Sequence, residues 1–248
     1  MDLLEKPQSL IRRHPWETSR FTFLRRILHK AHVLRPDLRV LDVGAGDAWL
    51  GRQMMTTVPG KMDLTCWDKG YGELAVSSDA QIRWCRDRPQ GRFDLLLLLD
   101  VLEHIPDDRS FLKEIVSLNA APGSYLLITV PCWPLFFGAH DVRLQHLRRY
   151  RPRDCRSLLI SAGLNIMSEG NFFHGPLIAR ALTVMSEKLR ISPRPPKDLG
   201  QWDHGAGLTR LVTWALTLDN HCSELFARWG WSIPGLSYWA LCQKKPSS

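Results

Sequence analysis

The residues best suited to hold a ligand lie within Arg39–Leu50, where an acidic side chain and two glycines follow a short apolar run. Asp42 precedes Gly44 and Gly46 in the string R-V-L-D-V-G-A-G-D-A-W-L. Glycines there let the backbone turn sharply and come close to a ligand. A carboxylate before the first glycine suits a ligand with a cationic amino group and hydroxyls better than a pyrophosphate. The pattern therefore points to S-adenosylmethionine (SAM).

The spacing of the two glycines also matches part of the dinucleotide-binding fingerprint, G-x-G-x-x-G. That fingerprint needs a third small residue so that the helix can pack closely on the strand. Trp49 occupies the third position, and its indole would block this approach. An NAD-type dehydrogenase and an ordinary glycine-rich turn are the alternatives to a SAM site.

Two further aspartates follow strand-like runs. Asp68 comes directly after Met62–Trp67 and roughly 20 residues beyond the glycines, where a carboxylate can accept hydrogen bonds from both ribose hydroxyls. Asp87 follows the short run Gln81–Cys85 and could accept a hydrogen bond from an adenine amino group. Ordinary exposed turns are the alternative interpretation of both positions.

A run of leucines predicts the centre of the sheet. It lies in F-D-L-L-L-L-L-D-V-L-E-H-I-P-D-D, residues Phe93–Asp108, and is typical of a strand buried on both faces of a parallel sheet. Asp100 stands where this strand ends, and ligands of open α/β sheets bind outside the carboxyl ends of the strands. A helix over 107–119 follows, and acidic residues in its first turn complement its dipole.

With these segments in place, the chain resembles the class I SAM-dependent methyltransferases, and within them the small-molecule subgroup of the type 11/12 kind. The matching segments occur in the family's order over roughly 38–170: L-D-V-G-A-G (41–46), Asp68, F-D-L-L-L-L-L-D-V-L-E-H-I (93–105) and A-P-G-S-Y-L-L-I-T-V-P (121–131). The string Asp47-Ala48-Trp49 departs from the pattern, because many relatives carry small or hydroxylic residues there. The resemblance implies an α/β, Rossmann-like, doubly wound sheet of seven strands, mostly parallel with an antiparallel last strand, and helices on both faces.

The resemblance also implies a cofactor and a reaction. We expect SAM to contact Asp42, Gly44, Ala45, Gly46, Asp68, Asp87, Asp100 and Leu102. The expected enzyme is a SAM-dependent methyltransferase that acts by SN2 displacement on a small-molecule acceptor, either aromatic, polyketide-like or lipid-linked. An RNA or protein methyltransferase and a non-catalytic SAM-binding protein are the alternatives.

Methyl transfer to a hydroxyl needs an aligned nucleophile and a group that removes a proton. Imidazole titrates near neutral pH, so the candidates are His140, His146 and His104. The string G-A-H-D-V-R-L-Q-H-L-R-R-Y (138–150) resembles a recurrent G-x-H-D…H-x-R-R-Y segment of small-molecule methyltransferases. From this region we expect the acceptor to contact Trp133, Arg149 and Tyr150.

Structural roles are the alternatives for the same residues. His140, Asp141 and Arg149 could instead hold a turn together, and His104 could pack under the cofactor at a helix start. A metal-dependent, catechol-type mechanism would need several carboxylate or amide oxygens around a divalent cation. Asp100 and Glu103 are available, but no Asp-Asn pair follows in the matching place. We therefore expect no metal.

The chain is expected to form one domain over 1–248, with a helical cap over 1–37, a SAM-binding core over 38–170, a helical insertion or lid over 171–235, and a last strand and tail over 236–248. Within it the patterns predict helices over 16–34, 151–162 and 209–229. They also predict a sixth strand over 164–168 and a last strand over 235–243. A loop is expected over 135–149 and a turn or linker over 192–197. The tryptophan-rich insertion has three interpretations: an apolar lid over a greasy or aromatic substrate, core filling, or an amphipathic helix on a membrane surface.

The composition, with 44% hydrophobic and 23% charged residues, is that of a globular enzyme. The net charge of +8 raises nucleic acid or an anionic membrane surface as partners, but the arginines are dispersed. D-V-L-E also replaces the Asn/Asp-Pro-Pro-aromatic turn common in enzymes that methylate base amino groups. We therefore expect no nucleic acid, while peripheral contact with a membrane or a lipid-linked substrate stays open, as does the oligomeric state. Six cysteines without metal spacing and the lack of a signal core favour the cytoplasm.

Overall fold

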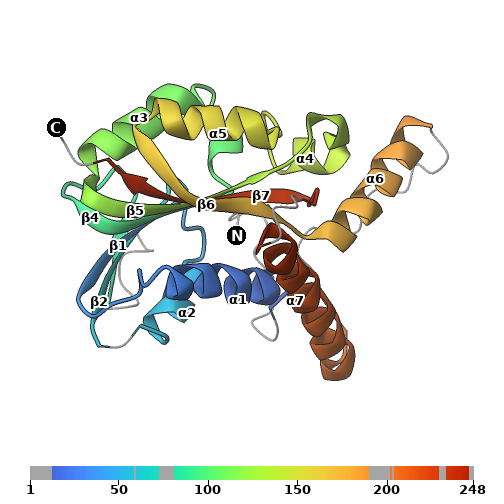
Figure 1. The fold of residues 1–248 in the computed structure, drawn as a ribbon, viewed down its shortest axis with the longest axis horizontal. Helices are drawn as coiled ribbons and strands as arrows, with labels where there is room; N and C mark the ends of the chain where they lie inside the picture. Colours follow the sequence, from blue (N-terminus) through green and yellow to red (C-terminus); the bar gives the residue numbers. More distant parts are fainter. Residues whose placement is uncertain are drawn as a thin grey trace.

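The computed structural model describes residues 13–58, 60–72, 81–189, 202, 204–228 and 233–245 of the 248-residue chain. Figure 1 shows one twisted sheet with a layer of helices on each side and one further helix that projects from one end. The linker that the sequence predicts over 192–197 lies outside the described residues.

Seven strands form the sheet in the order β3-β2-β1-β4-β5-β7-β6. The first five run parallel, and β7 runs antiparallel between β5 and β6. The predicted doubly wound sheet with an antiparallel last strand is therefore confirmed. The strands span Leu38–Val43 (β1), Met62–Trp67 (β2), Ile82–Cys85 (β3), Phe93–Leu99 (β4), Ala120–Pro131 (β5), Leu164–Phe172 (β6) and Ser237–Lys244 (β7).

Helices cover both faces of the sheet, as Figure 1 shows. One face carries α1 (Pro15–Lys30), α2 (Trp49–Met55) and α7 (Ala206–Arg228), and the other carries α3 (Asp108–Leu118) and α5 (Pro152–Ser161). Short turns lie near the strand ends: η3 (Leu102–His104), η4 (Pro134–Phe136) and α4 (Ala139–Arg143). α6 (His174–Lys188) projects from the end of the molecule that carries β6 and β7.

The leucine run forms the central strand β4 because its side chains alternate between two apolar cores. Leu96 and Leu98 pack with α3 and α5, while Leu95 and Leu97 pack with α1 and α2. All four are fully buried. Each such side chain contributes roughly 1.5–3 kcal/mol relative to an exposed one, so this strand anchors both layers.

The predicted ends of two helices are confirmed by their local chemistry. Asp107 caps α3, and its side chain accepts a 3.0 Å hydrogen bond from the backbone N–H of Ser110. Pro152 occupies the first turn of α5, where a missing N–H costs nothing. Gly163 follows α5 with φ +84°, a conformation that favours glycine.

Two segments differ from the sequence-based expectation. The predicted loop over 135–149 contains part of η4 and all of α4, because a buried carboxylate organises it, as described below. β6 continues to Phe172, beyond the predicted sixth strand and past the expected start of the insertion at residue 171. Residues 169–171 lie beyond the predicted strand, but they pair with Ala240, Trp239 and Tyr238 of β7.

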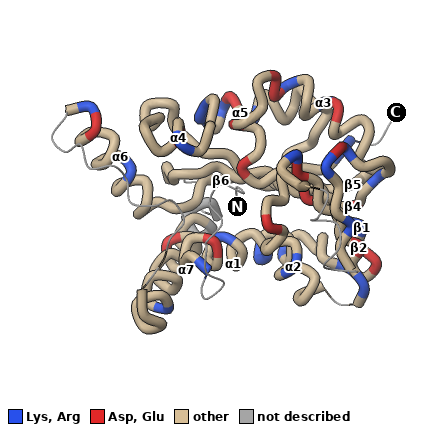
Figure 2. The backbone as a smooth tube through the Cα atoms, turned by 180° about the vertical axis from the view of Figure 1, so that it is seen from behind, with Lys and Arg blue, Asp and Glu red and all other residues tan. Residues whose placement is uncertain are grey.

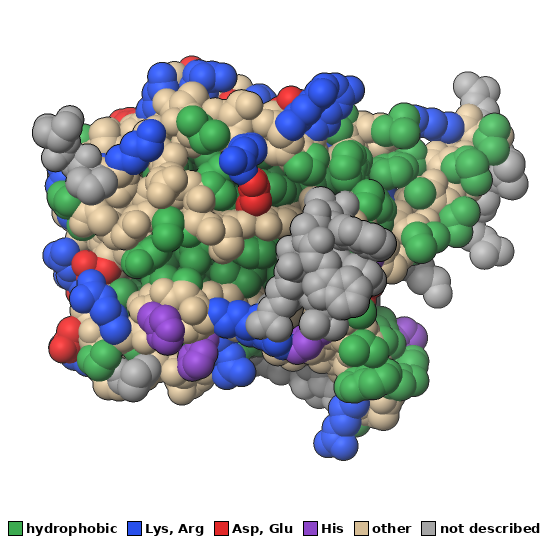
Figure 3. Space-filling model, in the orientation of Figure 1, with side chains coloured by type: hydrophobic (Ala, Val, Ile, Leu, Met, Phe, Trp, Pro, Cys, Tyr) green, Lys and Arg blue, Asp and Glu red, His purple; other side chains and the backbone are tan. Residues whose placement is uncertain are grey.

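Apolar side chains lie exposed on the two helices of the insertion, where Figure 3 shows hydrophobic surface. Trp214 of α7 is 62% exposed, so core filling does not apply to it, whereas Trp239 of β7 is buried. The other exposed apolar side chains of these helices follow helical spacing: Ile178, Leu182, Met185 and Leu189 in or next to α6, and Leu208, Leu211 and Leu218 in α7.

Charge is spread over the molecule. Figure 2 colours the backbone by residue type, and Lys and Arg positions occur on helices of both layers, in keeping with the dispersed arginines of the sequence. Among the residues that the structure describes, no helix combines the length and the apolarity needed to cross a membrane.

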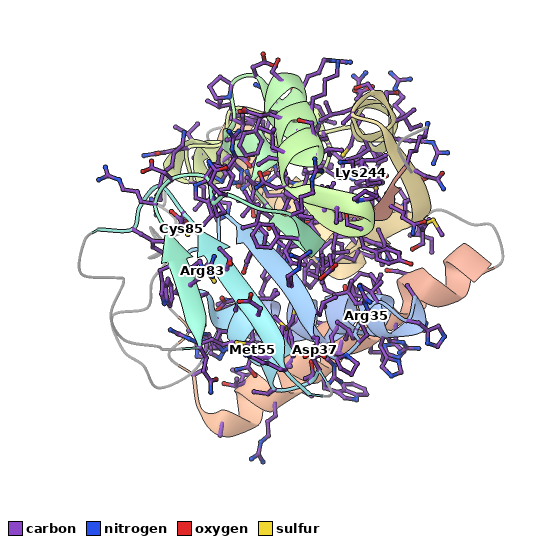
Figure 4. All side chains as sticks on the ribbon, turned by 90° about the vertical axis from the view of Figure 1, so that its left-hand side faces the viewer. Arg35, Asp37, Met55, Arg83, Cys85 and Lys244 are labelled. Carbon is purple, nitrogen blue, oxygen red and sulfur yellow. The ribbon has the colours of Figure 1, made fainter. Side chains whose placement is uncertain are left out.

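The parallel strands all point their carboxyl ends to one edge of the sheet. In Figure 4, Asp37 marks the chain just before β1 and Cys85 the last residue of β3, so the two labels lie at opposite ends of two parallel strands that β2 separates. The edge at which β3 ends is the edge where ligands bind in open α/β sheets.

Candidate active site

A cavity of about 980 Å³ opens at the carboxyl ends of β1, β2, β4 and β5. Its volume lies at the upper end of the usual range of ligand pockets, about 300–1,000 Å³. The cavity lies where the strand order reverses between β1 and β4, which is the switch point of the sheet. Helices α1 and α6 supply further wall residues from outside the sheet.

The glycine turn after β1 forms part of the cavity wall. Gly44 has φ +64°, and a Cβ there would lie 2.9 Å from a methyl carbon of Val101. The position thus needs glycine both for its backbone conformation and for its contact with the chain after β4. Asp42 also lines the cavity but is only 4% exposed. Burial raises the pKa of its carboxyl to about 7.

Asp68 joins the two turns that follow β1 and β2. Its Oδ2 accepts a 2.9 Å hydrogen bond from the N–H of Gly46, and its Oδ1 accepts a 2.8 Å hydrogen bond from the N–H of Gly70. Asp68 lines the cavity. The carboxylate is therefore held in a fixed orientation, and its remaining lone pairs can accept hydrogen bonds from a ligand.

The structure brings most, but not all, of the expected cofactor residues to the cavity. Those in its wall are Asp42, Gly44, Ala45, Asp68 and Asp100. Three others do not line it. The N–H of Gly46 donates a hydrogen bond to Asp68. Asp87 lies exposed after the edge strand β3, and Leu102 is fully buried.

Helix α1 contributes cavity residues for which the sequence carried no chemical signal. Trp16, Glu17 and Arg20 line the wall. Arg20 Nη1 lies 2.8 Å from Asp100 Oδ2, and Arg20 Nη2 donates a 2.6 Å hydrogen bond to Thr129 Oγ1. The Thr129 hydroxyl in turn donates to Asp100 Oδ1 at 2.9 Å. The first helix is thus tied to the ends of β4 and β5.

Asp141 is the polar centre of the segment after β5. Its side chain is fully buried, and its Oδ1 lies 2.8 Å from Arg149 Nε and 3.0 Å from His146 Nδ1. Its Oδ2 accepts hydrogen bonds from Arg180 Nη2 at 2.7 Å and from the N–H of Gly138 at 3.0 Å. Burial alone would raise the pKa of Asp141, but the hydrogen bond from His146 and the two guanidinium groups hold this pKa below its usual value.

The three candidate histidines all line the cavity, in different environments. The ring of His146 is fixed by Asp141, and it meets the ring of His104 edge to face at 4.8 Å between centroids. Burial, reinforced by the charge of Arg180, lowers the pKa of His140 to about 4. His140 is therefore neutral at physiological pH but a weaker base than an ordinary imidazole.

Glu103 stands beside His104 and was not among the expected site residues. It lines the cavity yet is fully buried, and neither of its carboxylate oxygens has a hydrogen-bond partner in the described part of the chain. Burial, with the nearby charge of Asp100, raises its pKa well above the usual value. Ligand atoms of Glu103, His104 and His146 lie within 4.8 Å of one another, close enough to hold a metal ion.

The three residues expected to contact the acceptor have different surroundings. Arg149 lines the cavity, but its Nε and Nη1 already bind Asp141 and the carbonyl of Cys132. Trp133 lies outside the cavity and donates from Nε1 to the carbonyl of Gly235. Tyr150 is buried, and its hydroxyl contacts Asp108 at 2.6 Å. The alternative in which Asp141 and Arg149 hold a turn together describes the observed contacts of Arg149.

A family model described as "Methyltransferase domain" matches residues 16–169 of the chain. Among curated proteins, a ubiquinone biosynthesis O-methyltransferase of Xanthomonas campestris pv. campestris (strain B100) is 27% identical over 133 residues, which cover 50% of this chain and 56% of that protein. The protein of the same description from Azorhizobium caulinodans is 26% identical over 156 residues and is covered over 62% of its length. The chain thus spans little more than half the length of these relatives.

Solved structures share the fold at low sequence identity. The [4+2]-cyclase SpnF superposes with a TM-score of 0.54 and 14% identity, over 99% of this chain and 90% of that one. A SAM-dependent methyltransferase from Mesorhizobium loti superposes with a TM-score of 0.52 and 15% identity, over 91% of this chain and 98% of that one. At these identities the likeness concerns the fold alone.

Proposed function

This chain belongs to the family of methyltransferase domains, and we propose that it transfers a methyl group from SAM to a hydroxyl of a small-molecule acceptor. The observation that carries the proposal is one cavity at the switch point of the sheet that combines Asp42, Asp68 and the Gly44 turn with a histidine whose ring is fixed by a buried carboxylate. SAM would supply a sulfonium methyl group that is already electrophilic, so the protein has only to bind, orient and deprotonate.

The residues at the strand ends fit SAM. The buried carboxyl of Asp42 suits the cofactor's ammonium group, because a cation favours the ionised form of a carboxyl whose pKa lies near 7. The rigidly held carboxylate of Asp68 suits two ribose hydroxyls. At Gly44 no side chain separates the ligand from the backbone.

The part of the cavity around His146 supports the assignment of a base that deprotonates the acceptor. Asp141 Oδ1 lies 3.0 Å from His146 Nδ1, so the proton of the neutral ring stays on Nδ1 and the lone pair on Nε2. In this assignment the acceptor hydroxyl gives its proton to His146 Nε2 as its oxygen takes the methyl group. His140 is the poorer choice because its pKa is near 4.

The walls and the relatives support an apolar or aromatic alcohol as the acceptor. Trp16, Trp49 and Phe111 line the cavity, and aromatic walls favour apolar or aromatic ligands. The curated relatives carry the name of an O-methyltransferase, which favours a hydroxyl over a carbon or an amine.

The first test is thermal unfolding with saturating SAM, S-adenosylhomocysteine, NAD or NADP. A ligand at 100 times its Kd stabilises a protein by roughly 2.7 kcal/mol. Stabilisation by SAM and S-adenosylhomocysteine alone supports the cofactor, and stabilisation by the nicotinamide nucleotides alone contradicts it. Transfer of a labelled methyl group to a panel of phenols then tests the acceptor class. SAM binding without transfer to any hydroxyl would favour the non-catalytic alternative.

The ribose contact has its own test. Asp68→Asn should weaken SAM binding. Both carboxylate oxygens of Asp68 can accept hydrogen bonds from ribose hydroxyls, whereas an amide has one acceptor oxygen and an NH₂ group that only donates. Asp63→Asn is the matched control, since Asp63 is exposed on β2, the strand that leads to Asp68. Equal losses in the two variants would contradict the assignment of Asp68.

A further inference from the structure

The cavity wall contains a group of three metal-binding side chain types, of which the proposed reaction uses only His146. The carboxylate of Glu103 and the imidazoles of His104 and His146 place their nitrogen and oxygen atoms within 4.8 Å of one another. We propose that these three residues form a binding site for a divalent transition-metal ion, such as Zn²⁺ or Co²⁺.

The carboxylate of Glu103 is the first argument. It is fully buried, and neither oxygen has a hydrogen-bond partner in the described part of the chain. Buried carboxyl groups are normally paired, hydrogen-bonded or bound to a metal, because an unpartnered one loses its hydration without compensation. Arg149 and Arg20 direct their hydrogen bonds to other groups. Arg149 binds Asp141 and the carbonyl of Cys132, and Arg20 binds Asp100 and Thr129. A bound cation would supply the missing partner.

The orientation of His146 is the second argument. Its Nδ1 lies 3.0 Å from Asp141 Oδ1, which leaves Nε2 as the ring atom able to bind an ion. A carboxylate behind a ligating imidazole is the usual arrangement in metal sites, because it fixes the tautomer and raises the basicity of the ligand atom. Asp141 is itself held by Arg149 and Arg180, so the ring cannot rotate freely.

The backbone holds the two ligand segments in register, which is the third argument. The carbonyl of Glu103 accepts a 2.8 Å hydrogen bond from the N–H of Leu147, the residue that follows His146. Glu103 and His104 are consecutive in the short turn η3, and the His104 ring meets the His146 ring at 4.8 Å between centroids. The protein thus brings the backbone of the three ligand residues together before any ion binds.

The ligand types select the class of ion. Two imidazoles and one carboxylate suit Zn²⁺, Co²⁺ and their first-row neighbours, whereas Mg²⁺ and Ca²⁺ prefer sites made of oxygen ligands. Bonds of about 2.0–2.1 Å in tetrahedral geometry place ligand atoms roughly 3.4 Å apart, so small rotations of the side chains would complete the site. The sequence-based expectation of no metal rested on oxygen ligands alone, so it left out a site made of two imidazoles and one carboxylate.

Three protein ligands leave one position of a tetrahedral ion open, as in catalytic rather than structural sites. All three residues line the cavity, so the open position would face a water or the oxygen of an acceptor. This last role rests on the proposed function, but binding of the ion does not. An ion at His146 Nε2 would also occupy the atom otherwise assigned as the base, so metal and proton compete for it.

The test is direct binding of metal to the full chain after treatment with a chelator. Co²⁺ titration, followed by its visible absorption, and Zn²⁺ titration by calorimetry should each give one equivalent bound. Glu103→Gln, His104→Gln and His146→Gln should each weaken the Kd by 10-fold or more. His140→Gln is the matched control, because His140 lines the same cavity outside the group and should leave the Kd unchanged.

Retention of wild-type affinity by the three variants would overturn the proposal, as would an equal loss in His140→Gln. Each variant's unfolding midpoint, measured without metal, shows whether it folds. Zn²⁺ should raise the midpoints of the wild type and of His140→Gln by more than those of the three ligand variants. Titration of SAM on the same samples separates the two proposals. Metal binding without SAM binding would overturn the proposed function alone, and the reverse result would overturn the metal site alone.

Discussion

Arg20 Nη1 lies 2.8 Å from Asp100 Oδ2, so an ion pair joins the first helix to the end of the central strand. The pair lies in the wall of the cavity, with the Arg20 side chain 11% and the Asp100 side chain 34% exposed. The N-terminal helix therefore forms part of the cavity wall and is not merely packed on the sheet. Asp100, expected to contact the cofactor, has this arginine as its principal partner.

Removal of this arginine should cost stability. Arg20→Met removes the ion pair with Asp100 and the hydrogen bond to Thr129, and loss of a hydrogen-bonded, partly buried charge costs about 1.5–3 kcal/mol. Urea unfolding measures this loss. Arg25→Met is the control because Arg25 is exposed on the same helix, and its effect should stay within about 0.5 kcal/mol. Equal losses in the two variants would show that the ion pair adds nothing.

The affinity for SAM should depend on pH through Asp42. The carboxyl has a pKa of about 7 in the free protein, and only its ionised form attracts an ammonium group. Affinity should therefore fall as the pH drops below about 7, and Asp42→Asn should bind weakly at every pH with no such slope. Calorimetry over this range checks the prediction. An unchanged slope in the variant would assign the titration to another group.

The same substitution should stabilise the free protein in alkaline solution. The pKa of Asp42 is raised on folding from 3.8 to about 7, so the folded chain holds its proton more tightly than the unfolded chain does. That contribution to stability is complete below pH 3.8 and is lost as the pH rises through about 7. Asp42→Asn removes the buried charge, so its unfolding midpoint should exceed that of the wild type above about pH 7 and not below.

Stability at acid pH should depend on His140. Burial lowers its pKa from 6.5 in the unfolded chain to about 4 in the folded protein, so the unfolded chain binds the proton more tightly. The stabilising contribution is therefore present above pH 6.5 and is lost as the pH falls toward about 4. His140→Gln should lose less stability than the wild type over this interval in thermal unfolding. Parallel curves for the two proteins would mean that His140 does not titrate there.

The two cavity histidines should differ in their effect on turnover. His146→Gln should lower kcat by about 10²-fold or more with little change in SAM affinity, because the cofactor contacts are on other residues. His140→Gln should have a much smaller effect, since a group with a pKa near 4 takes up a proton poorly. A larger loss in His140→Gln would move the role of the base to that residue.

The parts of the site that follow parallel strands could be predicted from the sequence. Asp42, Asp68 and Asp100 lie in or directly after strands whose apolar runs are easily recognised, and parallel strands end at the same edge. Asp87 shows the limit of this reasoning. It also follows a strand, but β3 is the edge strand, two positions from β1, and the strand order is not visible in a local pattern.

The rest of the site depends on contacts between distant segments. The periodicity of α1 identified its packed face but could not indicate that Arg20 reaches the end of β4. Tyr150 follows Arg149 in the sequence, yet the two side chains have different surroundings: Arg149 binds Asp141 in the cavity wall, and Tyr150 contacts Asp108 at the start of α3. Such partners are set by tertiary packing, which local spacing does not encode.

Helix α6 touches the cavity with Ala179 and Thr183, and between them Arg180 binds the carboxylate that fixes His146. Arg180 therefore anchors the helix to Asp141, while Ala179 and Thr183 face the cavity. Substitutions at 179 and 183 can reshape the acceptor side of the cavity while the anchor stays in place. Under the proposed function, new acceptor preferences could thus be engineered by changing single residues of a helix outside the sheet without altering the contacts that hold His146.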